Sequence, residues 1–366
     1  MSEKTVGAGG DYSDLSAWEY AIQNEPAGTH TAKLISDFSD NTIINTWPSN
    51  TTLVIKSDVA GTNRKITSES TKSHVISVDD ADIASITIQD LTLDGTGQAA
   101  YKSALRISNG ANILALFERV MFTNATHHNV LISSGMDGTG ITFNNCIFEN
   151  GGTSAIRHLK VDVSNTTNFN NCLFVGNSSS QVYQSNANQT LNFNNCLAFG
   201  NTGAGFAHAG TNCVTNLDSC VSDDTSAELG THDSISNCKA GVTDPSSASP
   251  AYFTNYDEGD YSLAQSDMDS WGIQGNGAKT PVTDFTNTTR ENHSIGPYEF
   301  IVAPSSPSSS SSSSPVYTSF IYVGNGRSAT QRQENSSAGQ FQGSVKTIQA
   351  MSTYDSDFKH DTIVRN

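Results

Sequence analysis

A six-residue motif that recurs in the middle of the chain constrains the fold most strongly. The segment Phe143–Phe148, with the sequence FNNCIF, returns almost unchanged as Phe169–Phe174 and Phe193–Ala198. Looser copies are Ile88–Leu93, Phe117–Phe122, Leu217–Cys220 and Ile235–Cys238. Self-similarity of this kind is typical of solenoids, in which each repeat buries its apolar face only against its neighbours.

The aligned copies form two apolar columns with a polar pair between them. The first column is Ile88, Phe117, Phe143, Phe169, Phe193, Leu217 and Ile235, and the second is Leu91, Val120, Cys146, Cys172, Cys196, Cys220 and Cys238. Members of the second column are 29, 26, 26, 24, 24 and 18 residues apart, which fits one turn of a β-helix per step. The polar pair interrupts the alternation of a strand, so we expect a tight corner there. Asn tolerates left-handed backbone, so Asn145, Asn171, Asn195 and Asn237 are expected to stack at this corner.

A third strand per turn is expected about 15 residues before each copy. Candidates are Ala104–Ile107, Asn129–Ile132, Ala155–Arg157, Gln181–Tyr183 and Gly205–Ala207. Earlier turns are expected within residues 25–80, with strands at Leu34–Ile35, Leu53–Ile55 and Val75–Ile76. The predicted fold class is therefore all-β: a right-handed parallel β-helix with three short strands per turn.

Five of the six cysteines lie in the second apolar column. Because the same column accepts Leu91 and Val120, we interpret these cysteines as small buried hydrophobes with reduced thiols. Stacked thiols one strand spacing apart could also pair as disulfides, and the sequence leaves that alternative open. No spacing indicates a metal site.

The N-terminus predicts a cap for the open end of the β-helix. A glycine turn and a Ser/Asp cap precede a short amphipathic helix in which Leu15, Trp18 and Ile22 share one face. An open end would expose apolar interior and unpaired strand edges, so a covering element is required there.

Both ends of the body resemble right-handed parallel β-helix proteins of phage virions and bacterial surfaces, which have the pectate-lyase-like fold. Thr5–Tyr12 with Leu15–Trp18 is similar to their start. Asp260–Leu263, Asp284–Thr286 with Arg290, and Ile295–Glu299 are similar to their terminal module. The resemblance covers about residues 5–300 and implies the fold rather than an activity.

Composition divides the chain further at its C-terminal end. Three prolines and a run of seven consecutive serines make residues 304–315 an extended polar linker. The predicted domains are a cap (1–26), a parallel β-helix (27–245), a β module closing the helix (246–303), the linker (304–315) and a C-terminal docking segment (316–366). A disordered tail is the alternative for the last segment.

Two carboxylates are candidates for catalysis, because a glycosidase needs two such groups facing each other. Asp94 and Glu149 both lie three residues after the second column, two turns apart, with Thr123 between them. Arg157 is a candidate for the basic group of a lyase. Solvated turn residues are the alternative interpretation of these two acids. Asp90 and Glu118 are further candidate acids on the rungs.

A second candidate strip follows the first strand of each turn. Arg106, Arg157 and Tyr183 would bind a glycan there if they face outward, and His127, His128, His158 and His208 are expected in the same strip. Ordinary surface positions are the alternative. Acidic clusters at Asp79-Asp80-Asp82, Asp223-Asp224 and Asp257-Glu258-Asp260 suit Ca²⁺, but none has the spacing of a dedicated calcium loop, so no cofactor is expected.

The predicted function is a non-enzymatic phage virion structural protein: a capsid decoration, fibre or spike on the virion surface. The chain carries a net charge of −17, which argues against a nucleic-acid partner. The start shows no pattern of a secretory signal, and no apolar run suits a membrane span. Expected partners are other virion proteins bound through residues 316–366, a host surface glycan and further copies of the chain. The alternatives are a tailspike-like polysaccharide depolymerase, lyase or hydrolase, and a bacterial surface adhesin.

Overall fold

The computed structural model divides the chain into two units, Met1–Ile301 and Val302–Asn366. It describes residues 2–69, 74–79, 82–108, 113–132, 140–152, 154–158, 165–178, 183–185, 189–202, 205–206, 213–224, 233–248, 250–301, 320–324 and 327–331.

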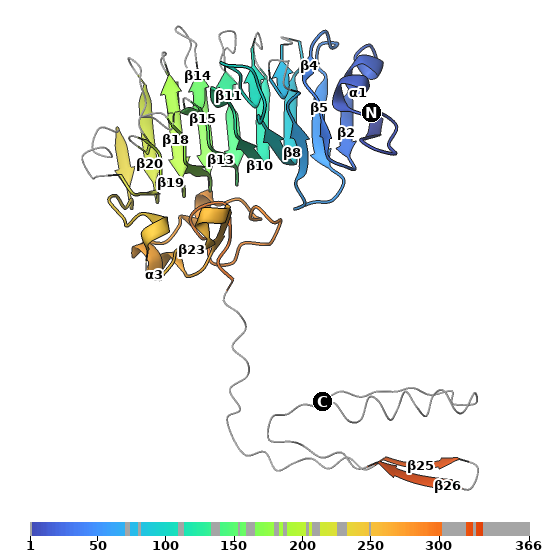
Figure 1. Cartoon of the computed structure of the whole chain (residues 1–366), viewed down its shortest axis with the longest axis vertical. Helices are drawn as coiled ribbons and strands as arrows, with labels where there is room; N and C mark the ends of the chain where they lie inside the picture. The colour runs from blue at the N-terminus through green and yellow to red at the C-terminus, as the bar shows by residue number, and fades with distance from the viewer. Residues whose placement is uncertain are drawn as a thin grey trace. The chain divides into compact units, whose positions relative to one another are not determined.

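The first unit is a parallel β-helix, as predicted (Figure 1). Its first face is a continuous parallel ladder that follows the chain from the N-terminal strand onward. The ladder consists of β1 (Ser2–Val6), β2 (Thr29–Leu34), β5 (Thr52–Ser57), β8 (Ser85–Asp94), β10 (Leu114–Thr123), β12 (Ile141–Asn144), β15 (Asn165–Asn170), β18 (Gln189–Asn194), β20 (Val214–Asp218) and β22 (Ser234–Ser236).

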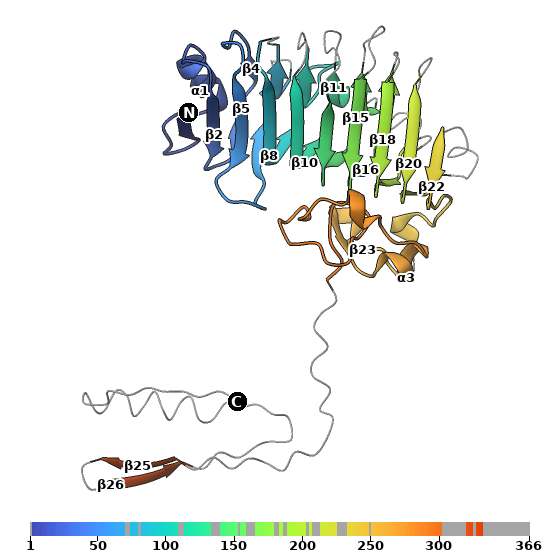
Figure 2. The ribbon, with the colours of Figure 1, turned by 180° about the vertical axis from the view of Figure 1, so that it is seen from behind.

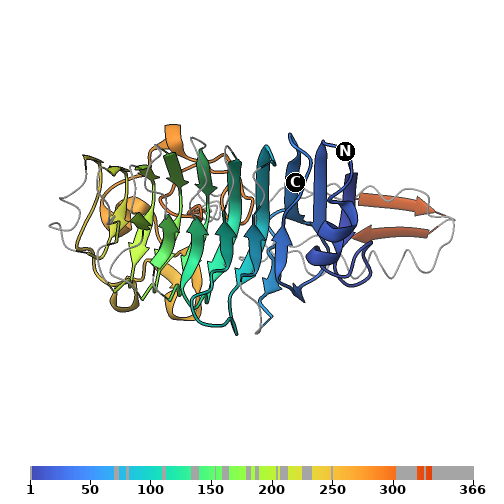
Figure 3. The same ribbon diagram turned by 90° about the horizontal axis from the view of Figure 1, so that it is seen from above.

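Two further faces complete each turn. The second contains β3 (Phe38–Ser39), β6 (Arg64–Thr67), the ends of β8 and β10, β13 (Ile147–Glu149), β16 (Leu173–Val175), β19 (Leu197–Phe199) and β21 (Val221–Ser222). The third contains β4 (Thr42–Ile44), β7 (Ile76–Val78), β9 (Leu105–Ile107), β11 (His128–Ile132), β14 (Ser154–His158) and β17 (Tyr183–Ser185). Three strands per turn are thereby confirmed. Seen from above, the turns succeed one another in chain order (Figure 3).

One expected third-face strand, at residues 205–207, is not found in its described part. Gly205 and Phe206 form a turn rather than a strand, although Phe206 is buried against Phe193 at 5.2 Å between ring centroids. Ala207, and Gln181 and Val182 of the preceding candidate, lie outside the described residues. The apolar signal at Phe206 was therefore read correctly as core but wrongly as a strand.

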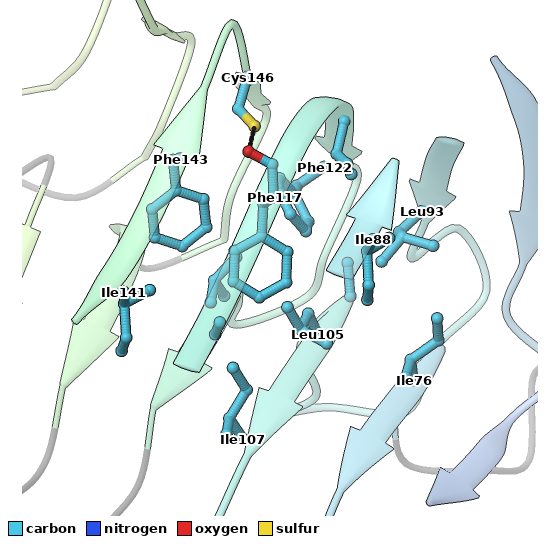
Figure 4. Packing of buried hydrophobic residues seen from close by; sticks show 14 of the residues in the cluster. Ile76, Ile88, Leu93, Leu105, Ile107, Phe117, Phe122, Ile141, Phe143 and Cys146 are labelled. Carbon is cyan, nitrogen blue, oxygen red and sulfur yellow. Dashed lines mark hydrogen bonds between the residues drawn. The ribbon is translucent and has the colours of Figure 1, made fainter. Parts of the chain in front are cut away.

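The first apolar column is confirmed residue by residue. Ile88 pairs with Phe117, and the register continues through Phe143, Phe169 and Phe193 to the end of the column. The four phenylalanine rings stack at 4.7, 5.2 and 4.6 Å between successive centroids, and Figure 4 shows the first pair inside the helix. Such stacks add to the burial of each ring.

The last member of that column departs from the rest. Ile235 holds the predicted register opposite Leu217, yet 45% of its surface is exposed. It belongs to β22, whose three residues are all exposed.

Four of the five cysteines in the second column are buried, Cys238 is half-buried, and all six cysteines of the chain are free thiols. The Cys172 thiol donates to the carbonyl oxygen of Phe143 at 3.4 Å, and the thiols of Cys146, Cys196 and Cys220 repeat this bond one turn away in each case. Figure 4 draws the Cys146 bond to Phe117. Burial raises the pKa of the Cys172 thiol well above its ordinary value. The interpretation of these residues as core packing is confirmed.

The corner between the first and second faces has left-handed backbone throughout. The φ angles are 52° at Asn145, 54° at Asn171, 54° at Asn195 and 51° at Asn237. Asp90, Arg119 and Ser219 occupy the same position in the other turns, each with a φ of 55°. The predicted Asn corner is therefore correct.

The N-terminal cap is also confirmed. Helix α1 (Leu15–Ile22) begins after Asp14, whose carboxylate accepts a hydrogen bond from the Ala17 backbone N–H at 2.7 Å. Leu15, Trp18 and Ile22 are buried, as their spacing predicted. An N-cap of this kind stabilises a short helix by about 1 kcal/mol.

The segment after residue 245 was expected to close the end of the β-helix, but it lies along the side (Figure 2). It contains a 3-10 helix η1 (Pro245–Ser247), β23 (Phe253–Asn255), η2 (Tyr256–Glu258), β24 (Asp260–Leu263), α3 (Asp267–Trp271) and η3 (Gly277–Lys279). We call residues 246–301 the side module. The reason is the outer surface of the second face, which is apolar and buried by the module at Ile147, Leu173, Val175, Leu197, Phe199 and Val221.

In the second unit the structure describes one antiparallel hairpin, formed by β25 (Phe320–Gly324) and β26 (Arg327–Gln331). The predicted linker at 304–315 lies outside the described residues. Within the described part of the chain, no helix has the length and apolar character needed to span a membrane.

Candidate functional site

The two predicted acids Asp94 and Glu149 lie in one column of the second face. Asp94 pairs with Thr123 on the next turn, and Thr123 pairs with Glu149 on the turn after that. Two strand spacings separate the acids, or roughly 10 Å along the helix. The expected alignment is therefore present, at the upper limit of the separation that an inverting glycosidase uses.

The carboxylate of Asp94 is occupied by its own turn. One oxygen accepts hydrogen bonds from the Thr96 backbone N–H at 2.9 Å, the Thr96 hydroxyl at 2.6 Å and the Asn124 amide at 3.2 Å. Burial alone would raise the pKa of Asp94, but these hydrogen bonds outweigh it and hold the pKa below its ordinary value. An acid in this state remains ionised and is poorly suited to donate a proton near neutral pH.

Glu149 is held by two hydroxyl groups, one on each carboxylate oxygen. The Thr123 hydroxyl donates at 2.9 Å, and the Tyr261 hydroxyl of the side module donates at 2.5 Å. Burial, and then the bond to Glu149, raises the pKa of Tyr261, so the phenol stays protonated as a donor. Glu149 thus anchors the side module to the β-helix.

An open cleft of about 440 Å³ lies beside this anchor. It is lined by Glu149, Asn150, Val175 and Gly176 of the β-helix and by Tyr256, Asp257, Glu258, Gly259 and Tyr261 of the side module. The lining contains three acids and no basic residue. Burial, followed by the charges of Asp244 and Asp223, raises the pKa of Tyr256, whose ring stacks on Phe253 at 5.7 Å. Such a cleft offers aromatic, acidic and hydrogen-bonding surface, and its Glu149 carboxylate is already bound by Thr123 and Tyr261.

The other two candidate acids are structural. Arg119 binds Asp90 through two hydrogen bonds at 2.6 and 3.2 Å and Glu118 through one at 2.7 Å. Arg119 and Asp90 are both almost fully buried, and Arg119 also donates to Thr283 of the side module at 3.1 Å. Asp90 and Glu118 are therefore ion-pair partners of Arg119.

The predicted glycan strip on the third face is only partly assembled. Arg106 is half-buried and pairs with Asp79 at 3.7 Å, and its strand position is in register with that of Arg157 two turns on. Tyr183 instead pairs with Ile156, in the column that contains the buried Leu105 and Val130. Gln184, the residue after Tyr183, is therefore the one in register with the two arginines.

Of the four histidines expected in that strip, the structure describes the side chains of His127 and His128, whose rings lie 3.8 Å apart between centroids. His128 is fully buried, whereas the neighbouring His127 is half-buried and contacts the Tyr101 ring at 5.6 Å. His158 lies in β14 in register with Ile132, and His208 lies outside the described residues.

The three acidic clusters considered for Ca²⁺ make local hydrogen bonds where they are described. Asp223 accepts from the Gly200 backbone N–H at 2.8 Å, and Asp224 accepts from the Ser222 hydroxyl at 3.0 Å. Glu258 accepts from Asn255, and Asp260 accepts from Ser262. Asp79 pairs with Arg106, and Asp80 lies outside the described residues. No described group of three or more His, Cys, Asp or Glu side chains is placed to hold a metal ion.

The sequence did not predict that the side module forms hydrogen bonds with the asparagines of the corner. Arg290 is buried and donates to Asn145 Oδ1 at 2.8 Å and to the carbonyl oxygens of Gly296 and Pro297 at 2.9 and 2.8 Å. Burial lowers the pKa of Arg290 to about 10. Asn171 Nδ2 donates to two module carbonyls, including that of Gly296 at 3.1 Å. The corner is therefore an interface as well as a turn.

Comparisons with known proteins add a fold similarity. No protein-family model matches the sequence, and no curated protein matches it either. The structure is similar to two crystal structures of the pectin methylesterase from Aspergillus niger, in a deglycosylated and a penultimately deglycosylated form. The identities are 13% and 14%, the TM-score is 0.39 for both, and each match covers 73% of this chain and 93% of the other. Similarity at this level concerns the fold alone.

Proposed function

We propose that this chain is a non-enzymatic structural protein of a phage particle, a capsid decoration, fibre or spike that displays the β-helix body. The single observation that carries the non-enzymatic part is the state of the acid pair. The Asp94 carboxylate is bound by Thr96 and Asn124, and both oxygens of Glu149 are bound by Thr123 and Tyr261. These acids hold turns and module together, so neither is available as the mobile acid or base of a hydrolase.

Display on a particle is supported by the organisation of the chain. A β-helix with a dense apolar interior forms a rigid body, because each turn is paired to its neighbours on three faces. The Pro/Ser segment 304–315 separates this body from residues 316–366, which are nearly neutral with five basic and four acidic residues. The strongly acidic body would stay soluble, while the neutral segment would bind other particle proteins.

The alternative of a polysaccharide lyase or hydrolase is tested by turnover. The full chain and a Glu149→Gln variant are incubated with a panel of neutral and acidic polysaccharides. Reducing ends and unsaturated sugar products are then measured. The proposal expects no turnover by either protein. Turnover by the full chain that is abolished in the Glu149→Gln variant would establish the enzyme and refute the proposal.

A further inference from the structure

A polar groove lies on the outer surface of the first face, away from the acids discussed above. It has a volume of about 350 Å³ and is lined by Thr142, Asn144, Asn168 and Asn170 of β12 and β15 and by residues 278–281 of the side module. We propose that this groove is a binding site for a neutral linear glycan. The site does not depend on the particle role proposed above, and its ligand is argued from the chemistry of its floor, wall and charge.

The floor consists of two ladders of side-chain amides. Asn170 Nδ2 donates to Asn144 Oδ1 at 2.9 Å, and Asn192 Nδ2 donates to Asn168 Oδ1 at the same distance. The ladders continue beyond the groove, where Asn216 donates to Asn192, also at 2.9 Å. A carboxamide has two N–H donors and an oxygen with two lone pairs. An amide that gives one donor and one acceptor to its neighbours therefore keeps one of each for a ligand.

The ladders also fix the positions of those remaining groups. Successive turns are about 4.8 Å apart, and residues two apart on a strand are about 7 Å apart. The groove thus presents donors and acceptors side by side in a rigid array. A sugar hydroxyl is both donor and acceptor, so a chain of sugars can satisfy such an array without carrying charge. Preorganised polar groups of this kind bind with little loss of side-chain freedom.

The wall is a module loop anchored to the corner of the β-helix. The Asn276 backbone N–H donates to Asn195 Oδ1 at 2.6 Å, and Asn195 Nδ2 donates to the Thr280 hydroxyl at 2.9 Å. Asn276 Nδ2 also donates to Asp218 at 2.8 Å. These bonds hold the loop beside the amide floor, so the groove is part of the folded body.

Charge decides which class of ligand fits. Lys279 is the one charged residue in the lining, and it pairs with Asp218 at 3.4 Å. The groove is therefore close to neutral on a chain whose net charge is −17. An anionic polymer would be repelled by the body, and a cation would prefer the acidic cleft at Glu149. A peptide strand would need a free sheet edge, whereas the groove lies over side chains of paired strands.

Binding is measured with the full chain by isothermal titration calorimetry. The probes are hexasaccharides of β-1,4-linked glucose, N-acetylglucosamine and xylose, with the hexamer of galacturonate as the anionic comparison. We expect at least one neutral hexasaccharide to bind and the galacturonate hexamer not to bind.

Asn168→Ala tests the floor, and Asn216→Ala is its matched control. Both residues are half-buried members of one ladder, and each shares one hydrogen bond with Asn192, but only Asn168 lines the groove. Asn168→Ala should weaken binding about tenfold, the effect of about one lost hydrogen bond. Asn216→Ala should change it by less than about twofold.

Ala278→Trp tests the same groove by filling it, since Ala278 is exposed on the wall and can accept a larger side chain. This variant should lose binding while its thermal midpoint is unchanged. Three results would overturn the proposal: no neutral probe binds, Asn216→Ala weakens binding as much as Asn168→Ala, or light scattering shows a dimer of the free protein that Ala278→Trp dissociates. The last result would assign the groove to a second copy of the chain. Incorporation into particles is measured separately, so the two proposals can fail independently.

Discussion

Replacing Asn171 by alanine should destabilise the body more than any exposed substitution. Asn171 is fully buried with a φ of 54°. Its amide donates to the carbonyl oxygens of Ser294 at 2.7 Å and Gly296 at 3.1 Å and accepts from Asn195 at 3.2 Å. Alanine in left-handed backbone costs about 1 kcal/mol. Three lost hydrogen bonds cost about 1 kcal/mol each, because Arg290 also donates to both carbonyls and keeps them satisfied. The free energy of unfolding should therefore fall by about 4 kcal/mol.

Two further variants separate the backbone contribution from the hydrogen bonds. Asn171→Gly removes the backbone cost and should be about 1 kcal/mol more stable than Asn171→Ala. Asn150 is exposed with a φ of 51°, so Asn150→Ala should lose only about 1 kcal/mol. Urea unfolding followed by circular dichroism and tryptophan fluorescence measures all three. The reasoning is refuted if Asn171→Ala costs no more than Asn150→Ala.

Three other predictions concern the side module and the core. Arg290→Met leaves Glu299 without its buried partner and should destabilise the side module by about 4 kcal/mol. Limited proteolysis should then remove the module while the β-helix resists. Equal resistance of the module and the β-helix would contradict this prediction. Burial raises the pKa of Asp267 to about 7, against about 3.9 in an unfolded chain. The folded state therefore binds a proton at Asp267 that the unfolded chain releases. This proton adds on the order of 4 kcal/mol to the free energy of unfolding below about pH 4, and the gain is lost as the pH rises through 7. Asp267→Asn keeps an acceptor for the Ile295 backbone N–H, and urea unfolding between pH 4 and 8 should show a flatter profile for it than for the unchanged protein. An aromatic disulfide reagent should modify at most the half-buried Cys238 in the folded protein and all six thiols after unfolding; rapid reaction of more than one thiol in the folded state would exclude a buried column.

The register of the β-helix was predictable because each turn repeats the same burial pattern. Phe143 and Cys146 are apolar on both sides of a polar pair, and only a corner with the two faces turned inward satisfies that pattern. The pairing of Phe143 with Phe169 follows directly from aligning the copies. Turns with weaker motifs were less informative: Phe206 is core, yet its segment forms no strand.

The position of the side module was not predicted, although a signal for it exists. After Cys146, Cys172 and Cys196, two apolar residues follow in succession, as in Ile147-Phe148 and Leu173-Phe174. Phe148 and Phe174 face the interior, whereas Ile147 and Leu173 face outward and are buried by the module. A strand that is apolar on both faces needs a covering layer on its outer side.

The candidate site was predictable only in its alignment. The spacing of Asp94 and Glu149 places them in one column, since strand register carries position from turn to turn. The partner that defines the role of Glu149 is Tyr261, which lies 112 residues further along the chain. The amide groove depends in the same way on a distant loop, anchored through Asn195 and Asn276. These contacts join residues far apart in the sequence and form when the side module packs against the β-helix. No local sequence pattern predicts them.

The central claim is that the chain is a displayed structural protein held on a particle by its C-terminal segment. The most direct test is the copy number of the protein in purified particles, measured by quantitative mass spectrometry for the full chain and for a variant that lacks residues 304–366. This deletion leaves the unit Met1–Ile301 intact. The account predicts a fixed, reproducible copy number for the full chain and loss of incorporation for the shortened one, which should remain soluble. Absence of the full chain from particles, or equal incorporation of the shortened chain, would contradict it.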